Sequence, residues 1–128
     1  MPGFYSDAER TAWIIAEQLM EKGRAVMRQA ESALDAFKVG MELNRRRCAR
    51  RGIGASDAEI RWTETADAKK AISENSFNVN QALMYYGAAA AHYSRAAYLR
   101  SCAADMERRS DRGGSRSGAV LPYGANRS

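Results

Sequence analysis

Proline is nearly missing from this 128-residue sequence, which contains only Pro2 and Pro122. Nothing in residues 3–121 therefore forbids a continuous helix, and collagen-like and proline-rich proteins are excluded. Cysteine is equally scarce: Cys48 and Cys102 are too few for a disulfide framework. We expect both to be small, partly buried apolar residues that do not bond to each other.

The sequence also lacks the residue clusters that catalysis and metal binding require. His92 is the only histidine, and it lies among alanines without the glutamate of a ferritin-type metal helix. The two cysteines have no metal-ligand spacing, and the Gly52–Gly54 segment lacks the lysine of a phosphate-binding loop. We predict a protein that is not an enzyme, with no catalytic residue, metal site, cofactor or small-molecule substrate.

No apolar run is long enough to span a membrane. The longest covers residues 82–91, whereas a spanning helix needs about 20 apolar residues. The first ten residues lack the basic and apolar regions of a secretory signal. We expect no membrane contact, and synthesis in a reducing cytoplasm.

Alanine, by contrast, is abundant, with 24 residues in a chain that is 45% hydrophobic and 27% charged. Alanine is the best helix former, and this balance is typical of a folded protein. Ser6 with Glu9, and Ser56 with Glu59, match the capping box that opens helices. The glycines of residues 52–54 mark a break between them. The sequence therefore predicts helices over about 7–51 and 57–109.

Apolar residues follow a heptad repeat in both predicted helices. Steps of three and four residues lead from Trp13 to Cys48 in the first helix and from Ala68 to Ala96 in the second. Such a seam packs helices side by side at a shallow angle. We predict an all-α fold: a long antiparallel two-helix hairpin, residues 1–110, with a flexible linker and extended C-terminal tail, residues 111–128.

The alternative fold is a four-helix bundle. It requires one more break in each helix, near Gly23 or Gly40 and near residues 73–76. Glycine lowers helix stability at these positions by about 1 kcal/mol relative to alanine, but no proline enforces a break.

The run of residues 82–91 is apolar around the whole helix. A single partner helix covers one stripe only, so another surface must cover the rest. We predict that this region contacts further copies of the chain or other protein subunits. The predicted contact residues are Leu83, Met84, Tyr86, Gly87, Ala89, Ala90 and Tyr93.

Positive charge is concentrated in two zones, the predicted hairpin tip (residues 45–61) and the open end with the tail (residues 95–128), each with a net charge of +4 within a net charge of +5 for the chain. Arginine binds phosphate and carboxylate groups, although arginines also complement the C-terminal dipole of a helix and pair with nearby glutamates. The arginines of the tip are Arg45, Arg46, Arg47, Arg50 and Arg51. In the tail, a second apolar segment is predicted to latch onto a neighbouring subunit: Val120, Leu121, Pro122 and Tyr123.

These features predict a non-enzymatic structural or assembly protein that packs through helix–helix contacts. Its expected setting is a homo-oligomer or a larger complex such as a virion. The alternative is a small nucleic-acid-binding or regulatory protein that uses the arginine-rich tip.

Overall fold

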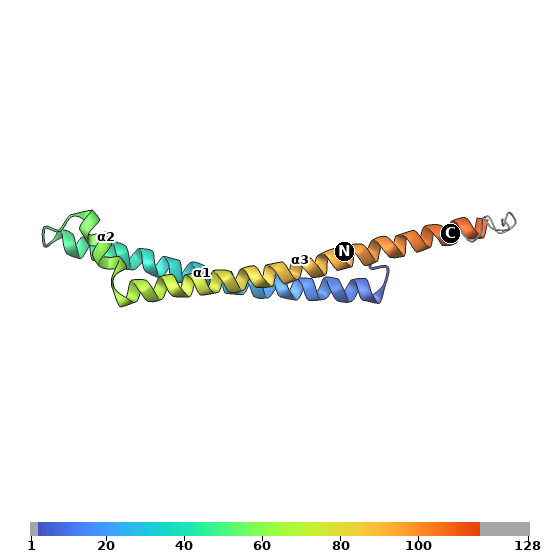
Figure 1. The fold of residues 1–128 in the computed structure, drawn as a ribbon, viewed down its shortest axis with the longest axis horizontal. Coiled ribbons are helices and arrows are strands. Elements are labelled where there is room, and N and C mark those ends of the chain that lie inside the picture. Colours follow the sequence, from blue (N-terminus) through green and yellow to red (C-terminus); the bar gives the residue numbers. More distant parts are fainter. Residues whose placement is uncertain (1–2, 116–128) are drawn as a thin grey trace. The chain divides into compact units, whose positions relative to one another are not determined.

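The computed structural model describes residues 3–115, and all of their regular structure is helical (Figure 1). Helix α1 covers Asp7–Ala49, α2 covers Ala55–Thr63 and α3 covers Ala66–Ser115. Within these residues there is no strand. The all-α hairpin is confirmed and the four-helix bundle is not formed, because α1 runs unbroken through both glycines and α3 through residues 73–76.

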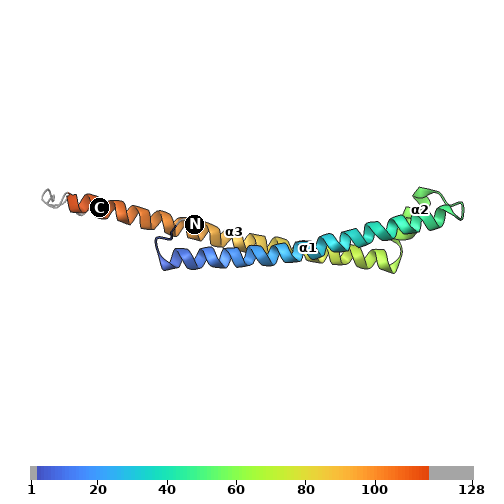
Figure 2. The same ribbon diagram turned by 180° about the vertical axis from the view of Figure 1, so that it is seen from behind.

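The chain divides into two compact units. One is Gln18–Ala88, and the other combines Met1–Glu17 with Ala89–Ser128. In each unit, a part of α1 lies antiparallel beside a part of α3 (Figures 1 and 2). Helix α3 continues past its predicted end near residue 109 to Ser115. The predicted tail arm, residues 120–123, lies outside the described residues.

Alanine builds the seam in both units. Ten of the twelve buried apolar residues are alanines, and the others are Cys48 and Trp62. Such small side chains let helix backbones approach closely, and the Asn75 amide donates to the main-chain carbonyl of Ala30 at 2.8 Å. Cys48 is buried and Cys102 is half-buried, as expected for small apolar residues, and both are free. Most positions of the predicted seam are buried or half-buried, although Trp13 and Ile72 are exposed, and no large side chain within residues 3–111 is fully buried.

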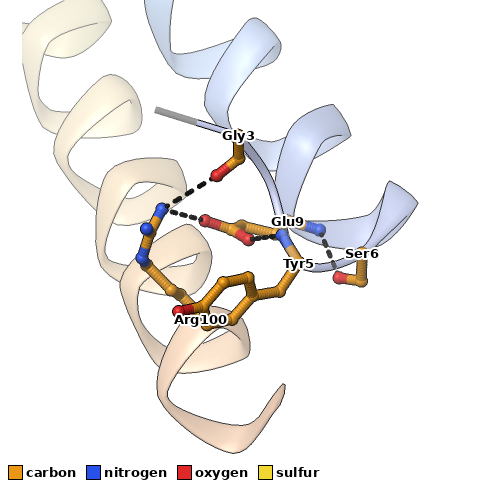
Figure 3. A network of polar contacts seen from close by, with 5 residues as sticks. All are labelled: Gly3, Tyr5, Ser6, Glu9 and Arg100. Carbon is orange, nitrogen blue, oxygen red and sulfur yellow. Dashed lines mark hydrogen bonds and ion pairs between the residues drawn. The ribbon is translucent and has the colours of Figure 1, made fainter. Parts of the chain in front are cut away.

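A polar network ties the start of α1 to α3 (Figure 3). The Glu9 amide donates to Ser6 Oγ at 3.1 Å, which confirms the predicted cap, and the Glu9 carboxylate accepts from the Tyr5 amide at 2.7 Å. Its other oxygen lies 3.2 Å from Arg100 Nη1, which also donates to the Gly3 carbonyl at 3.3 Å. The Arg100 guanidinium lies 4.8 Å from the centre of the Tyr5 ring. Glu9 is only 3% exposed, so Arg100 neutralises a buried charge.

We expect Arg100→Met to destabilise the fold by about 1–3 kcal/mol, because Glu9 would keep its buried charge without a counter-ion. The effect is smaller than for a fully buried pair because the Arg100 side chain is 41% exposed. Urea denaturation followed by circular dichroism measures it. Arg109→Met, at an exposed position of the same helix, is the control and should change stability by less than about 0.5 kcal/mol. Equal losses in the two variants would contradict the role of Arg100.

Helix α1 ends in a glycine cap, as the sequence predicts. Gly52 has a φ of +78°, the left-handed conformation that glycine adopts without strain. The Ile53 amide donates to the Cys48 carbonyl and the Gly52 amide to the Ala49 carbonyl, both at 3.0 Å. These two bonds form a Schellman motif, which satisfies the last carbonyl groups of the helix.

The predicted capping box of the second helix is wrong. Helix α2 begins at Ala55, and its N-cap is Gly54 with no side-chain hydrogen bond. Ser56 and Glu59 therefore lie inside the helix. The extended backbone of Gly54 (φ −70°, ψ 162°) provides the entry that the serine was expected to provide.

The predicted continuous second helix is also wrong, because it is divided between α2 and α3. Thr65 Oγ1 donates to the Trp62 carbonyl at 2.7 Å and accepts from the Ala68 amide at 3.2 Å. One side chain thus helps to end α2 and caps α3. The Trp62 ring packs on Gly40 of α1, where an added Cβ would lie 2.2 Å from Trp62 Cη2.

Candidate interaction surface

The structure separates the predicted contact residues into an inner and an outer set. Ala89 is completely buried in the alanine seam, and Tyr86 and Tyr93 are half-buried. The remaining four are exposed: Leu83, Met84, Gly87 and Ala90. The outer set is therefore available to a partner, whereas the inner set holds the hairpin together.

The two half-buried tyrosines serve the hairpin. Tyr86 lies over Gly23 of α1, where an added Cβ would be 2.5 Å from Tyr86 Cε1. In the other unit, the Tyr93 hydroxyl donates to the Glu17 carboxylate. Its ring packs in a T-shaped arrangement with that of Trp13, with ring centres 4.9 Å apart and planes at 70°.

The outer face of α3 carries no charge over more than five helical turns. Residues 75–94 include no aspartate, glutamate, lysine or arginine. Large apolar side chains are exposed there: Met84 is 70% exposed and Phe77 is 62% exposed. The exposed residues of this stretch are Ser76, Phe77, Asn80, Leu83, Met84, Gly87, Ala88, Ala90, Ala91 and Ser94.

The outer face of α1 is built differently. It carries charges of both signs, and Arg24 forms a 2.8 Å ion pair with Glu21. Its exposed charged residues between positions 17 and 38 are Glu17, Glu21, Lys22, Arg24, Arg28, Glu31, Asp35 and Lys38. Between residues 17 and 38, α1 thus has the surface of a solvated helix, whereas α3 between residues 75 and 94 does not.

Two aromatic residues of the outer face, Phe77 and Tyr98, were not among the predicted contacts. They lie seven and fourteen residues from Met84, with Ala91 completing the spacing, so a heptad count would have found them. Tyr98 is 65% exposed, and a hydrogen bond with the Cys102 thiol raises the pKa of its hydroxyl above the ordinary value of 10.0. Tyr98 is therefore neutral at physiological pH.

All five arginines of the predicted tip are exposed. Glu42 forms ion pairs with two of them, Arg45 at 2.5 Å and Arg46 at 3.2 Å. These pairs and the C-terminal dipole of α1 account for part of the cluster. Contact with phosphate or an acidic protein stays a prediction for all five; Arg47, Arg50 and Arg51 have no ion pair within the described residues.

A groove of about 670 Å³ opens beside Trp62 in the unit Gln18–Ala88. Its lining combines apolar Val39 and Leu43 with the carboxylates of Asp35 and Asp67. Trp62 Nε1 is buried without a hydrogen-bond partner. In the part of the chain that the structure describes, no three histidine, cysteine or acidic residues gather closely enough to hold a metal ion.

Within residues 3–115, no helix combines the length and apolarity needed to cross a membrane. No protein family matches the chain, and no curated protein or solved structure is significantly similar to it. The chemistry of its own surfaces is therefore the basis for assigning a function.

Proposed function

We propose that this chain is a non-enzymatic structural or assembly protein that self-associates through helix–helix contacts. The observation that carries the proposal is the charge-free outer face of α3, with Phe77, Leu83 and Met84 exposed on it. The virion setting stays a prediction, as does the C-terminal arm, whose residues lie outside the described part of the chain.

A helix face that remains in water is normally polar or charged, and a contiguous exposed apolar patch is typical of an interaction site. The two long helices of this chain provide an internal comparison. The outer face of α1 is charged, and that of α3 is not. The composition of the whole chain cannot explain this contrast, since both helices are rich in alanine. A contact surface on α3 explains it.

The hairpin alone leaves several large hydrophobic side chains exposed to water. Burying a leucine, phenylalanine or methionine side chain contributes about 1.5–3 kcal/mol, whereas an alanine methyl contributes about 0.8 kcal/mol. The seam is made of alanine, and Leu83 is 56% exposed outside it. A partner packed on α3 would gain the hydrophobic free energy that the isolated hairpin does not use.

Size-exclusion chromatography with light scattering tests self-association. We expect a mass of at least twice the 14.1 kDa of the chain at micromolar concentration. The mass should be the same in low and in molar salt, because apolar burial is not screened. Phosphate binding at the arginine tip would instead weaken steeply with salt. A single species of 14.1 kDa up to millimolar concentration would contradict the proposal.

A further inference from the structure

Two rows of side chains run along the outer face of α3, each with a spacing of seven residues. All nine positions are exposed and none is charged. The first row carries the large side chains and one alanine: Phe77, Met84, Ala91 and Tyr98. The second row, three or four residues away, is small: Ser73, Asn80, Gly87, Ser94 and Ser101. Together they form a second heptad seam on the back of the helix, which nothing in the chain's described part covers.

We propose that this face binds the same face of a second copy, with the two α3 helices antiparallel about a twofold axis. The inference rests on the proposed function and names its partner. A twofold interface uses the same patch on both copies, so the patch must be complementary to itself. A large row beside a small row meets this requirement.

The size of the side chains favours the antiparallel arrangement. When the helices run in opposite directions, the large row of one copy faces the small row of the other. In the register centred near residues 85 and 86, Met84 faces Gly87 of the second copy, and Phe77 faces Ser94 of the second copy. In a parallel pair each row would face itself, so that Phe77 meets Phe77 and the Gly87 layer is left as a void, which is destabilising.

Charge favours the same register. Glu74 and Arg95 are exposed, lie three heptads apart on one flank of this face, and bound its charge-free stretch. The antiparallel register places Glu74 opposite Arg95 of the second copy, and by symmetry it does so twice. In a parallel, in-register pair Glu74 and Arg95 of the second copy would lie three heptads apart, so this pairing would not form. The nearest cation on Glu74's own chain, Lys70, is 4.0 Å away, so Glu74 is not held by a tight internal pair.

The surface that the face offers is substantial. An aromatic side chain buries about 150–250 Å², and Phe77 and Tyr98 are 62% and 65% exposed. These two side chains thus offer about 200–300 Å² in each copy, where a stable interface needs about 800 Å² per partner. Met84, Leu83 and the exposed alanines contribute further area between them, and a two-copy contact suits a face of this size.

Disulfide trapping tests the arrangement. In a Cys48→Ala, Cys102→Ala background, Asn80→Cys and Ala91→Cys are prepared as separate proteins and oxidised alone or mixed. The antiparallel register places Asn80 opposite Ala91 of the second copy, within the about 7 Å that a disulfide requires between Cα atoms. Two copies of position 80 would be eleven residues apart along the axis, about 16 Å. We expect a covalent dimer, containing one chain of each variant by mass spectrometry, only in the mixture.

Each other outcome overturns the inference. Cross-linking of Asn80→Cys with itself would show a parallel pair. The mixture could stay unlinked although light scattering on the same sample reports a dimer. That result would place the contact on another surface, and the proposed function would still hold. A background protein that is folded by circular dichroism and monomeric at every concentration would overturn both.

Discussion

Ala89→Glu is expected to unfold the hairpin, whereas its neighbour Ala90→Glu is expected to leave it folded and weaken self-association. Ala89 is completely buried in the seam. A carboxylate there would lose its hydration without gaining a partner, and would force apart two helices that only a methyl group separates. We expect a loss of about 3–5 kcal/mol, a large part of the stability of a domain of this size.

Ala90 is the next residue, about 100° further around the helix, and is exposed. On a free chain a glutamate there should change stability by less than about 0.5 kcal/mol. In the proposed assembly it would lie beside Leu83 of the second copy, where the carboxylate loses water without gaining a hydrogen bond. We expect association to weaken by at least about tenfold, equivalent to about 1.4 kcal/mol. Circular dichroism reports the fold and light scattering the mass.

Ala36→Glu is the matched control, because Ala36 is an exposed alanine of α1, on whose outer face charged residues already lie. It should change neither the fold nor the mass. If Ala90→Glu and Ala36→Glu associate equally well, the outer face of α3 is not the contact. If Ala89→Glu stays folded, the assignment of the seam is wrong.

The helices and their seam could be predicted because their determinants are local. The Ser6 cap, the Gly52 cap and the apolar spacing each act over a few residues, and both caps are confirmed. The division between α2 and α3 depends on a contact that joins distant parts of the chain. Trp62 packs on Gly40, twenty-two residues earlier, and the Thr65 hydroxyl donates to the Trp62 carbonyl at the turn between the two helices. Periodicity alone does not reveal such a pairing.

The candidate surface was found only in part for a similar reason. An apolar stretch indicates that some partner exists, but not which residues face it. That assignment needs the phase of the alanine seam, which places Ala89 inside and Ala90 outside. Phe77 was missed because its neighbours Ser76 and Asn78 are polar, and Tyr98 because it lies beyond Arg95, outside the apolar run. Only their spacing of seven and fourteen residues from Met84 connects them. The Glu9–Arg100 pair joins residues ninety-one positions apart, and no sequence spacing predicts it.

Gly87→Gln is expected to stabilise the single chain and weaken the assembly. Glycine inside a helix is less favourable than glutamine by roughly 0.5–1 kcal/mol. Gly23 and Gly40 have a steric reason for lacking a side chain, since aromatic rings occupy that space. Gly87 has none within the chain, because an added Cβ there would meet no atom within 4 Å. Inside the described hairpin, the substitution should therefore be purely favourable.

In the proposed contact, the effect of Gly87→Gln is unfavourable instead of favourable. Met84 of the second copy faces Gly87, so a glutamine side chain would hold the two helices apart, and we expect association to weaken by at least about tenfold. The melting temperature at a concentration where the chain is monomeric measures the stabilisation of the single chain. The concentration dependence of the mass measures the weakening of association. Gly40→Gln is the control: it should lose about 1–3 kcal/mol, because the buried Trp62 ring would have to move. A variant that simply folds less well would have a lower melting temperature. A higher melting temperature of the monomer together with weaker association is therefore specific to a glycine that faces a partner. A stabilised variant that associates as the parent does would remove Gly87 from the interface.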